Sequence, residues 1–167
     1  TIVGDGCLME GISYEAASLA GHLNLDNLIV IFDDNGISID GSTSLAVSED
    51  HLAKFKAFGF EVESIDGHDF DQINASLQRA NASVKPYFIA CKTIIGKGVD
   101  LKAGSEKSHG SPLGKSEIEY LKNNSSFNHK PFEIEKKLLD AWKEFGKKNI
   151  VLFDKWQKLF AELDSKD

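Results

Sequence analysis

The sequence predicts an α/β fold with a parallel sheet, followed by a separate helical segment. The first indication is the apolar run LIVIF over 28–32, because such a run is typical of a parallel strand buried on both faces. The second is that strand and helix patterns alternate through residues 1–94, which favours right-handed crossover connections. The third is a change to amphipathic helical patterns after Pro131, which places a boundary near 125–131.

The individual elements follow from local patterns. Ile12, Ala16, Leu19, Ala20 and Leu23 recur at helical spacing and predict a helix over 11–23. Further helices are predicted over 48–58, 70–82 and 115–124, and further strands over 1–4, 60–65 and 87–94. The glycine-rich stretch 95–114 is predicted to be a functional loop because of its length. The last stretch is predicted to form two amphipathic helices that meet near Gly146.

Composition narrows the possible classes of function. The chain has 167 residues, of which 41% are hydrophobic and 27% charged, as in ordinary globular proteins. A net charge of −7 argues against a nucleic-acid partner. No apolar run is long enough to cross a membrane. The two cysteines, Cys7 and Cys91, are too few for a disulfide framework, which favours a cytoplasmic location.

A carboxylate between two glycines follows the first predicted strand. Gly4 and Gly6 would let the backbone turn sharply and approach a phosphate closely. Asp5 would repel such an anion unless a cation lay between them, and Mg²⁺ commonly bridges carboxylates to substrate phosphates. The stretch therefore indicates a metal-bridged diphosphate, and a plain turn is an equally good interpretation when it is considered alone.

Asn35 strengthens the first interpretation. It follows Asp5 by 30 positions, an interval that one helix and one strand fill, so both residues can lie at the ends of neighbouring parallel strands. The Asn35 side-chain oxygen and a nearby carbonyl, that of Ile37, would complete the protein ligands. The alternative is a hairpin turn at Asn35-Gly36, which is the better interpretation of that dipeptide by itself.

The same residues carry a family resemblance. GDG followed some thirty residues later by DN resembles the thiamine diphosphate-binding motif, and GDGCLMEGISYEAASLAGHLNLDNLIVIFDDNGISIDG is similar to the transketolase family. KTIIGKG at 92–98, AGSEKSHGSPLG at 103–114 and PFEI at 131–134 match later segments in order. The resemblance implies a three-layer, parallel-sheet thiamine diphosphate-binding fold, incomplete here. Residues 1–125 would be the C-terminal part of the diphosphate-binding domain, and 126–167 a helical linker towards a pyrimidine-binding domain.

The resemblance also implies roles for single residues. Asp5, Asn35 and the Ile37 carbonyl would bind Mg²⁺, for which Ca²⁺ can substitute, and Gly4 and Gly6 would lie against the diphosphate. His109 would contact cofactor and sugar and is the catalytic candidate. Glu10 and Glu15 would belong to an acidic network at a subunit interface, although carboxylates at a helix start also offset its dipole. Ile94 or Ile95 would pack against the cofactor, and the other four histidines are expected to be structural or exposed.

The implied activity is transfer of a two-carbon ketol unit from a ketose phosphate to an aldose phosphate, in the pentose phosphate pathway, by a homodimer. The glutamate that activates the cofactor's aminopyrimidine would lie in the missing pyrimidine-binding domain, so these 167 residues are expected to be a piece of a larger enzyme and inactive alone. Two alternatives remain open: a different thiamine enzyme, such as dihydroxyacetone synthase or deoxyxylulose-phosphate synthase, and a non-catalytic cofactor-binding subunit.

Overall fold

The computed structural model describes residues 1–125 and 129–163. The chain divides into two compact units, Thr1–Ser125 and Ser126–Asp167. None of the described helices is both long enough and apolar enough to cross a membrane.

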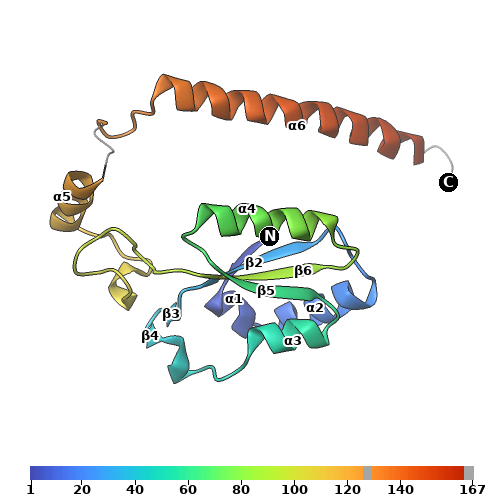
Figure 1. Ribbon diagram of the computed structural model, residues 1–167, viewed down its shortest axis with the longest axis horizontal. Helices are drawn as coiled ribbons and strands as arrows, with labels where there is room; N and C mark the ends of the chain where they lie inside the picture. The colour runs from blue at the N-terminus through green and yellow to red at the C-terminus, as the bar shows by residue number, and fades with distance from the viewer. Residues whose placement is uncertain (126–128, 164–167) are drawn as a thin grey trace. The chain divides into compact units, whose positions relative to one another are not determined.

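The first unit is built on a four-stranded sheet whose neighbouring strands are all parallel (Figure 1). Its order is β1 (Ile2–Gly4), β2 (Ile29–Asp34), β6 (Tyr87–Lys92) and β5 (Glu61–Asp66). The predicted parallel sheet is therefore confirmed. Because the strands are parallel, their carboxyl ends meet at one edge, where Gly4 pairs with Asp33 and Asp34 with Lys92.

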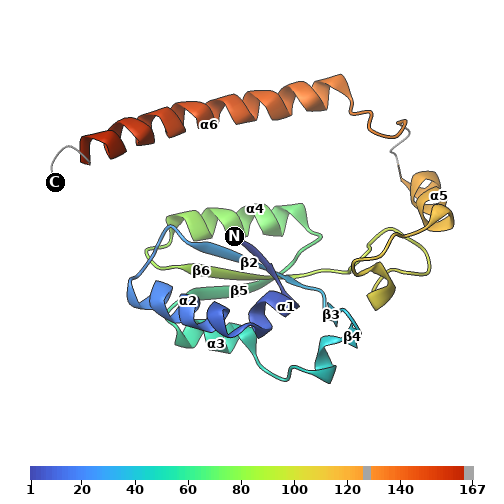
Figure 2. The ribbon, with the colours of Figure 1, turned by 180° about the vertical axis from the view of Figure 1, so that it is seen from behind.

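Helices cover both faces of this sheet, giving three layers (Figures 1 and 2). On one face lie α1 (Asp5–Met9), α2 (Gly11–His22) and α3 (His51–Ala57), and on the other lies α4 (Phe70–Ala82). The predicted 48–58 helix begins only at His51, because the Asp50 carboxylate caps it by accepting a hydrogen bond from the Ala53 N–H at 2.9 Å. Asp69 caps α4 in the same way.

Aromatic side chains form the centre of the core under α2 and α3. The rings of Phe55 and Phe88 stack with their centroids 3.8 Å apart, and Phe32 and Phe60 complete the group. All four side chains are buried. Phe55 therefore anchors α3 to the central strand β6, and burial of each ring contributes about 2–3 kcal/mol.

A partly buried polar cluster fastens α4 to the opposite face. The Glu63 carboxylate of β5 accepts hydrogen bonds from Ser76 at 2.6 Å, Tyr87 at 3.0 Å and Arg79 at 2.5 Å. Burial alone would raise the pKa of Glu63, but these three donors outweigh it and hold the pKa below its usual value. Glu63 is thus a charged residue with a complete set of partners, which is what burial of a charge requires.

The predicted helix over 11–23 exists, but its inward face differs from the one that the apolar spacing indicated. Ile12, Leu19 and Leu23 are exposed, and the small residues Ala17 and Ala20 lie in the core. Gly21 lies so close to the end of α3 that an added Cβ would overlap the Phe58 carbonyl oxygen. The inward face is set by this close approach between α2 and α3, which only small side chains allow.

The loop over 95–114 is ordered by α5 (Lys115–Asn124). The Glu117 side chain of α5 is buried and accepts hydrogen bonds from the backbone N–H groups of Asp100, at 2.8 Å, and Leu101. Lys102 donates to the Leu113 carbonyl at 2.7 Å, which joins the middle of the loop to its end. A carboxylate outside the loop therefore substitutes for the backbone partners that a loop lacks.

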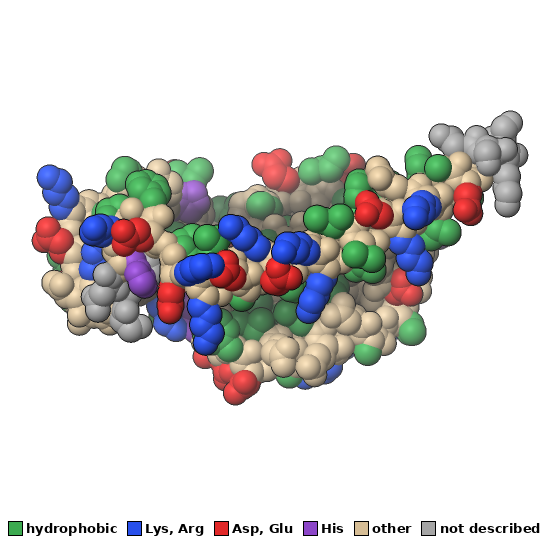
Figure 3. All heavy atoms as spheres, turned by 90° about the horizontal axis from the view of Figure 1, so that it is seen from above, with side chains coloured by type: hydrophobic (Ala, Val, Ile, Leu, Met, Phe, Trp, Pro, Cys, Tyr) green, Lys and Arg blue, Asp and Glu red, His purple; other side chains and the backbone are tan. Residues whose placement is uncertain are grey.

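The second unit contains one long helix, α6 (Lys136–Leu163). The predicted pair of helices meeting near Gly146 is wrong, because the apolar positions Trp142, Phe145, Leu152 and Trp156 keep the same helical phase on both sides of this glycine. A glycine costs a helix only about 1 kcal/mol relative to alanine, too little to end it. Charged side chains of both signs lie among hydrophobic ones on the face of α6 seen in Figure 3.

Two glycine substitutions test these helix assignments. We expect Gly21→Ala to lower the free energy of unfolding by about 3 kcal/mol, because the new methyl group meets a backbone carbonyl that cannot move aside. Gly146→Ala, where no atom lies within 4 Å of the added Cβ, should instead raise the helical content. Urea unfolding measures the first and far-ultraviolet circular dichroism the second. Loss of helix in Gly146→Ala would contradict a continuous α6.

Replacing Glu63 by alanine tests the polar cluster. The substitution leaves the Ser76 and Tyr87 hydroxyls without their acceptor, so we expect a loss of about 2–3 kcal/mol in unfolding free energy at pH 7. Because the folded-state pKa is lowered, the stabilisation is complete above the unfolded value near 4.5 and disappears as the pH falls through the folded-state value. Urea unfolding at several pH values measures this. Glu61→Ala, an exposed position on the same strand, is the control.

Candidate functional site

A cavity of about 610 Å³ opens at the carboxyl ends of β1 and β2. All the residues predicted to bind the metal, the diphosphate or the sugar line it: Gly4, Asp5, Gly6, Asn35, Ile37 and His109. Cys7, Met9, Glu10, Asp33, Ser38, Ile39 and Ile95 complete the wall. Residues from both ends of the first unit therefore share one cavity, at the edge of a parallel sheet where ligands usually bind.

Asp5 is the most unusual side chain of this cavity. It begins α1 and is only 7% exposed, and its Oδ2 atom is buried without a hydrogen-bond partner. Burial, and then the charges of Asp34 and Asp33, raise the pKa of Asp5 to about 6. A buried carboxylate oxygen with no donor is costly unless a cation binds it, so this atom fits a metal ligand.

The two glycines beside Asp5 contribute space. Gly4 is extended, with φ −105° and ψ 179°, and neither Gly4 nor Gly6 has a positive φ. The prediction that these glycines let the backbone turn sharply is therefore wrong, since the chain runs from β1 directly into the short helix α1 without a positive φ. No atom lies within 4 Å of a Cβ placed on either glycine, which leaves open room beside the backbone for a bound group.

Asn35 lies just beyond β2, and both ends of its side-chain amide have partners. Its Nδ2 donates to Asp33 Oδ2 at 3.0 Å, and its Oδ1 accepts from the Ile37 N–H at 2.9 Å. Gly36, at φ 69°, does not reverse the chain. The reversal comes later, between β3 (Ile37–Ser38) and β4 (Gly41–Ser42), where Ser38 pairs with Gly41. The hairpin-turn alternative for Asn35-Gly36 is therefore wrong.

Sequence reasoning missed several polar residues at the same strand ends. Asp33 accepts hydrogen bonds from Asn35 and from the Thr93 hydroxyl, and Asp34 forms an ion pair with Lys92. Lys92 ends the neighbouring strand β6 and Thr93 directly follows it. Both lie about 60 positions away in sequence, so only the β2–β6 register brings them here. The consecutive acidic residues after a buried strand are the one sequence signal that could have indicated them.

His109 reaches the cavity from the loop over 95–114. It directly follows a short 3-10 helix, Glu106–Ser108, and its N–H donates to the Glu106 carbonyl at 2.8 Å. Its side chain is exposed. Of the two isoleucines expected beside the cofactor, Ile95 lines the cavity. His109 thus lines the same cavity as the strand-end residues, from a segment far from them in sequence.

The two glutamates of the expected interface network are separated. Glu10, at the junction of α1 and α2, lines the cavity. Glu15 is exposed on α2 and lines a different hollow, together with Tyr14, Ser18, Leu19 and His22. Within this chain only Glu10 belongs to the candidate site.

A second, polar cavity of about 280 Å³ adjoins the first and shares Asp5 with it. His51 lines it, packs edge-on against Phe32 with ring centroids 5.3 Å apart, and has a buried Nδ1 atom without a hydrogen-bond partner. Burial lowers the pKa of His51, so the ring is neutral at pH 7. His68 has a structural role, because its Nε2 accepts a hydrogen bond from the Ile94 N–H at 2.9 Å.

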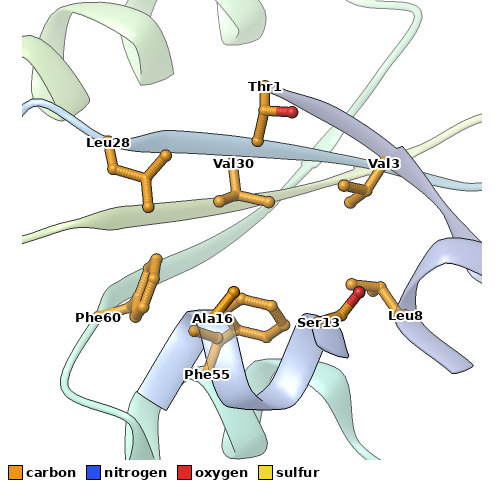
Figure 4. A pocket seen from close by; sticks show the side chains of 10 residues that line it. Thr1, Val3, Leu8, Ser13, Ala16, Leu28, Val30, Phe55 and Phe60 are labelled. Carbon is orange, nitrogen blue, oxygen red and sulfur yellow. The ribbon is translucent and has the colours of Figure 1, made fainter. Parts of the chain in front are cut away.

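A third cavity, of about 230 Å³, is apolar and lies between α2, α3 and the sheet (Figure 4). The side chains of Val3, Val30 and Leu28 point from the sheet toward those of Ala16 and Phe55. Its lining holds no charged side chain, so it offers no charged group to a phosphate or a metal ion.

The donor set at the first cavity is suited to a hard cation that is also bound by phosphate oxygens. Among the described residues, no three His, Cys, Asp or Glu side chains are grouped so that they could hold a metal ion by themselves. One carboxylate, one amide oxygen and a backbone carbonyl leave several coordination positions of Mg²⁺ for a ligand's oxygens. The site therefore fits a metal that arrives with, or binds to, a phosphorylated ligand.

Comparison with known proteins identifies the family. Residues 1–167 match the family model described as "Transketolase, thiamine diphosphate binding domain". The chain belongs to the transketolase family. The family resemblance and the thiamine diphosphate-binding fold expected from it are thereby confirmed.

Individual transketolases agree with this assignment. The chain is 47% identical to the transketolase of Buchnera aphidicola subsp. Schizaphis graminum over 161 residues, covering 95% of this chain and 24% of the relative. It is 43% identical to that of Sinorhizobium medicae over 155 residues, covering 93% of this chain and 22% of the relative. It thus spans about a quarter of the length of these transketolases.

Solved transketolase structures share the fold. The enzyme from Campylobacter jejuni superposes with a TM-score of 0.79 at 49% identity, covering 81% of this chain and 22% of that one. The Pichia stipitis transketolase complex with sedoheptulose-7-phosphate gives a TM-score of 0.86 at 40% identity, covering 96% and 24%.

Asp5→Asn tests the electrostatic state of the site. The pKa of Asp5 is near 6 in the folded protein and near its usual value of 3.8 in the unfolded chain. As the pH rises, the unfolded chain therefore loses this proton first. Between pH 3.8 and 6 this progressively destabilises the metal-free fold. We expect Asp5→Asn to stabilise the metal-free protein by about 2 kcal/mol at pH 7.5, since one pKa unit corresponds to about 1.4 kcal/mol.

The gain should shrink as the pH falls toward 4, where the folded wild-type carboxyl is protonated. Urea unfolding at pH 4.5, 6 and 7.5 without divalent cations measures it, and Asp26→Asn, at an exposed aspartate, is the control. A gain that is equal at every pH would show that Asp5 is not held as a costly buried charge.

Proposed function

We propose that this protein binds thiamine diphosphate through a divalent cation in the 610 Å³ cavity and serves in ketol transfer between sugar phosphates. The observation that carries the proposal is the buried, unpartnered Oδ2 atom of Asp5, in a cavity that Asn35 and Ile37 also line. Membership of the transketolase family and the match to a thiamine diphosphate binding domain support it.

Asp5, Asn35 Oδ1 and the Ile37 carbonyl oxygen would hold Mg²⁺, and Ca²⁺ would substitute because both cations prefer oxygen ligands. The open space beside Gly4 and Gly6 would receive the diphosphate. The raised pKa of Asp5 supports this arrangement, since the nearby acidic charges that destabilise the carboxylate would stabilise a cation.

When bound, thiamine diphosphate supplies the carbanion that carries the two-carbon unit. The chain's own residues would bind and orient the cofactor and the sugar and shield them from water. Ile95 and Ile39 would cover the apolar part of the cofactor, and His109 would hold or donate a proton to the sugar's oxygens from the exposed side of the cavity. The substrates would be ketose and aldose phosphates.

The assembly is part of the same proposal. Residues 1–125 would be the diphosphate-binding unit, and 126–167 a helical linker toward a pyrimidine-binding domain, with a homodimer as the complete enzyme. The division of the chain near Ser125 supports this, and so do the exposed hydrophobic side chains of α6, such as Trp142 and Trp156, which need a covering partner. Glu10 and Glu15 would meet partner groups at the subunit interface.

Two free cysteines are consistent with a cytoplasmic location.

Asp5→Ala and Asn35→Ala test the metal site. In the full-length protein, each should weaken Mg²⁺-dependent binding of thiamine diphosphate by about 100-fold, because a missing ligand cannot be replaced at a cavity wall. Isothermal titration with thiamine diphosphate, with and without Mg²⁺, measures this, followed by an assay with ketose and aldose phosphates. Asp26→Ala serves as the control for loss of a surface carboxylate. Wild-type affinity in both site variants would refute the proposed ligands.

A further inference from the structure

A chain of hydrogen bonds ends on the Asn35 side chain. The Thr93 hydroxyl donates to Asp33 Oδ1, and Asn35 Nδ2 donates to Asp33 Oδ2 at 3.0 Å. The Ile37 N–H then donates to Asn35 Oδ1 at 2.9 Å. Asp33 has both carboxylate oxygens engaged, and the chain crosses from the end of β6 to the end of β2.

These partners determine which way the Asn35 amide faces. A 180° flip of the amide would exchange its oxygen and its NH₂ group. The flipped NH₂ would then meet the Ile37 N–H, which is only a donor, and the flipped oxygen would meet the Asp33 carboxylate, which only accepts. Both ends therefore disfavour the flip, and the Asp33 end does so only while the Asp33 carboxylate is itself held in place.

Thr93 in turn fixes Asp33. The Thr93 N–H donates to the Asp34 carbonyl at 3.2 Å, which continues the β2–β6 pairing by one residue. The Thr93 methyl group lies beside Gly67, in the space that a side chain at position 67 would occupy if this residue were not glycine. With the methyl group placed there, the β-branched side chain has its hydroxyl directed to Asp33.

We propose that Asp33 and Thr93 are positioning residues that hold the Asn35 amide with its oxygen, and never its NH₂ group, available to a cation in the cavity. This inference rests on the proposed function, since it concerns the same site. Neither residue needs to touch the cation. An amide free to flip would present a donor group to the cation for part of the time, and a donor cannot bind it.

The Asp34–Lys92 ion pair leaves this arrangement undisturbed. Lys92 is the basic residue nearest in sequence to Thr93, and its Nζ pairs with Asp34, the neighbour of Asp33. Asp33 is thus left to its two neutral donors, the Thr93 hydroxyl and the Asn35 amide.

The pair Thr93→Val and Thr93→Ser tests the proposal. Valine keeps the branched shape beside Gly67 but removes the hydroxyl, and serine keeps the hydroxyl. In the full-length protein we expect Thr93→Val to weaken Mg²⁺ binding, titrated in the presence of thiamine diphosphate, by about tenfold or more, and Thr93→Ser to stay within about threefold of wild type. The thermal midpoint of the metal-free protein should be unchanged in Thr93→Ser and should fall by only about a few degrees in Thr93→Val, because one partly buried Asp33 oxygen loses its donor.

A second readout needs no cofactor. The two Asn35 side-chain N–H resonances, assigned by their loss in Asn35→Asp, should be distinct and slow to exchange with solvent in the metal-free wild type and in Thr93→Ser. In Thr93→Val they should exchange faster.

Unchanged resonances, or a fall in metal affinity that merely follows a fall in thermal midpoint, would overturn the inference. If the wild type itself fails to bind Mg²⁺ and thiamine diphosphate, the proposed function fails, and the resonances still decide whether Thr93 holds Asn35.

Discussion

The rest of the structure depends on one constraint: a carboxylate is buried at the edge of a parallel sheet with one oxygen left without a partner. Asp5 is there because β1 ends at Gly4 and α1 begins at once, which turns the side chain inward. The negative charges of the neighbouring Asp34 and Asp33 further destabilise the ionised Asp5 carboxylate. Such a concentration of negative charge lowers stability and persists where function needs it, so the fold gives up stability at the point where it gains a binding site.

The remaining architecture brings the other donors to that carboxylate and holds them there. Parallel pairing of β1, β2 and β6 places three strand ends side by side, and each end contributes polar groups: Asp5, Asn35 and Thr93. The aromatic core around Phe55 and the Glu63 cluster fix the two helical layers to the sheet. The strand ends therefore cannot shift relative to one another without disturbing the core, and this rigidity preorganises the site.

Sequence patterns predicted much of this and failed for identifiable reasons. The parallel sheet, the alternation of elements and the shared location of Asp5 and Asn35 follow from local apolar runs and from the length of one crossover. The inward face of α2 does not follow from the apolar pattern, because the contact between Gly21 and Phe58 sets it. A glycine in the sequence is also a weak indication that a helix ends, since α6 continues through Gly146. The hydrogen bond between Thr93 and Asp33 cannot be predicted from the sequence, since only the β2–β6 register brings the two residues together.

The Glu117 carboxylate has a consequence for how this family can vary. It holds the backbone at Asp100 and Leu101, and so it shapes the loop from which His109 enters the cavity. No residue of helix α5 lines the cavity, so substitutions in α5 leave the cavity wall itself unaltered. Changes of helix length or tilt there would move His109, while Asp5 and Asn35, which lie on other elements, would stay in place. The position of this histidine can therefore vary separately from the strand-end residues, through changes in a helix that does not line the cavity.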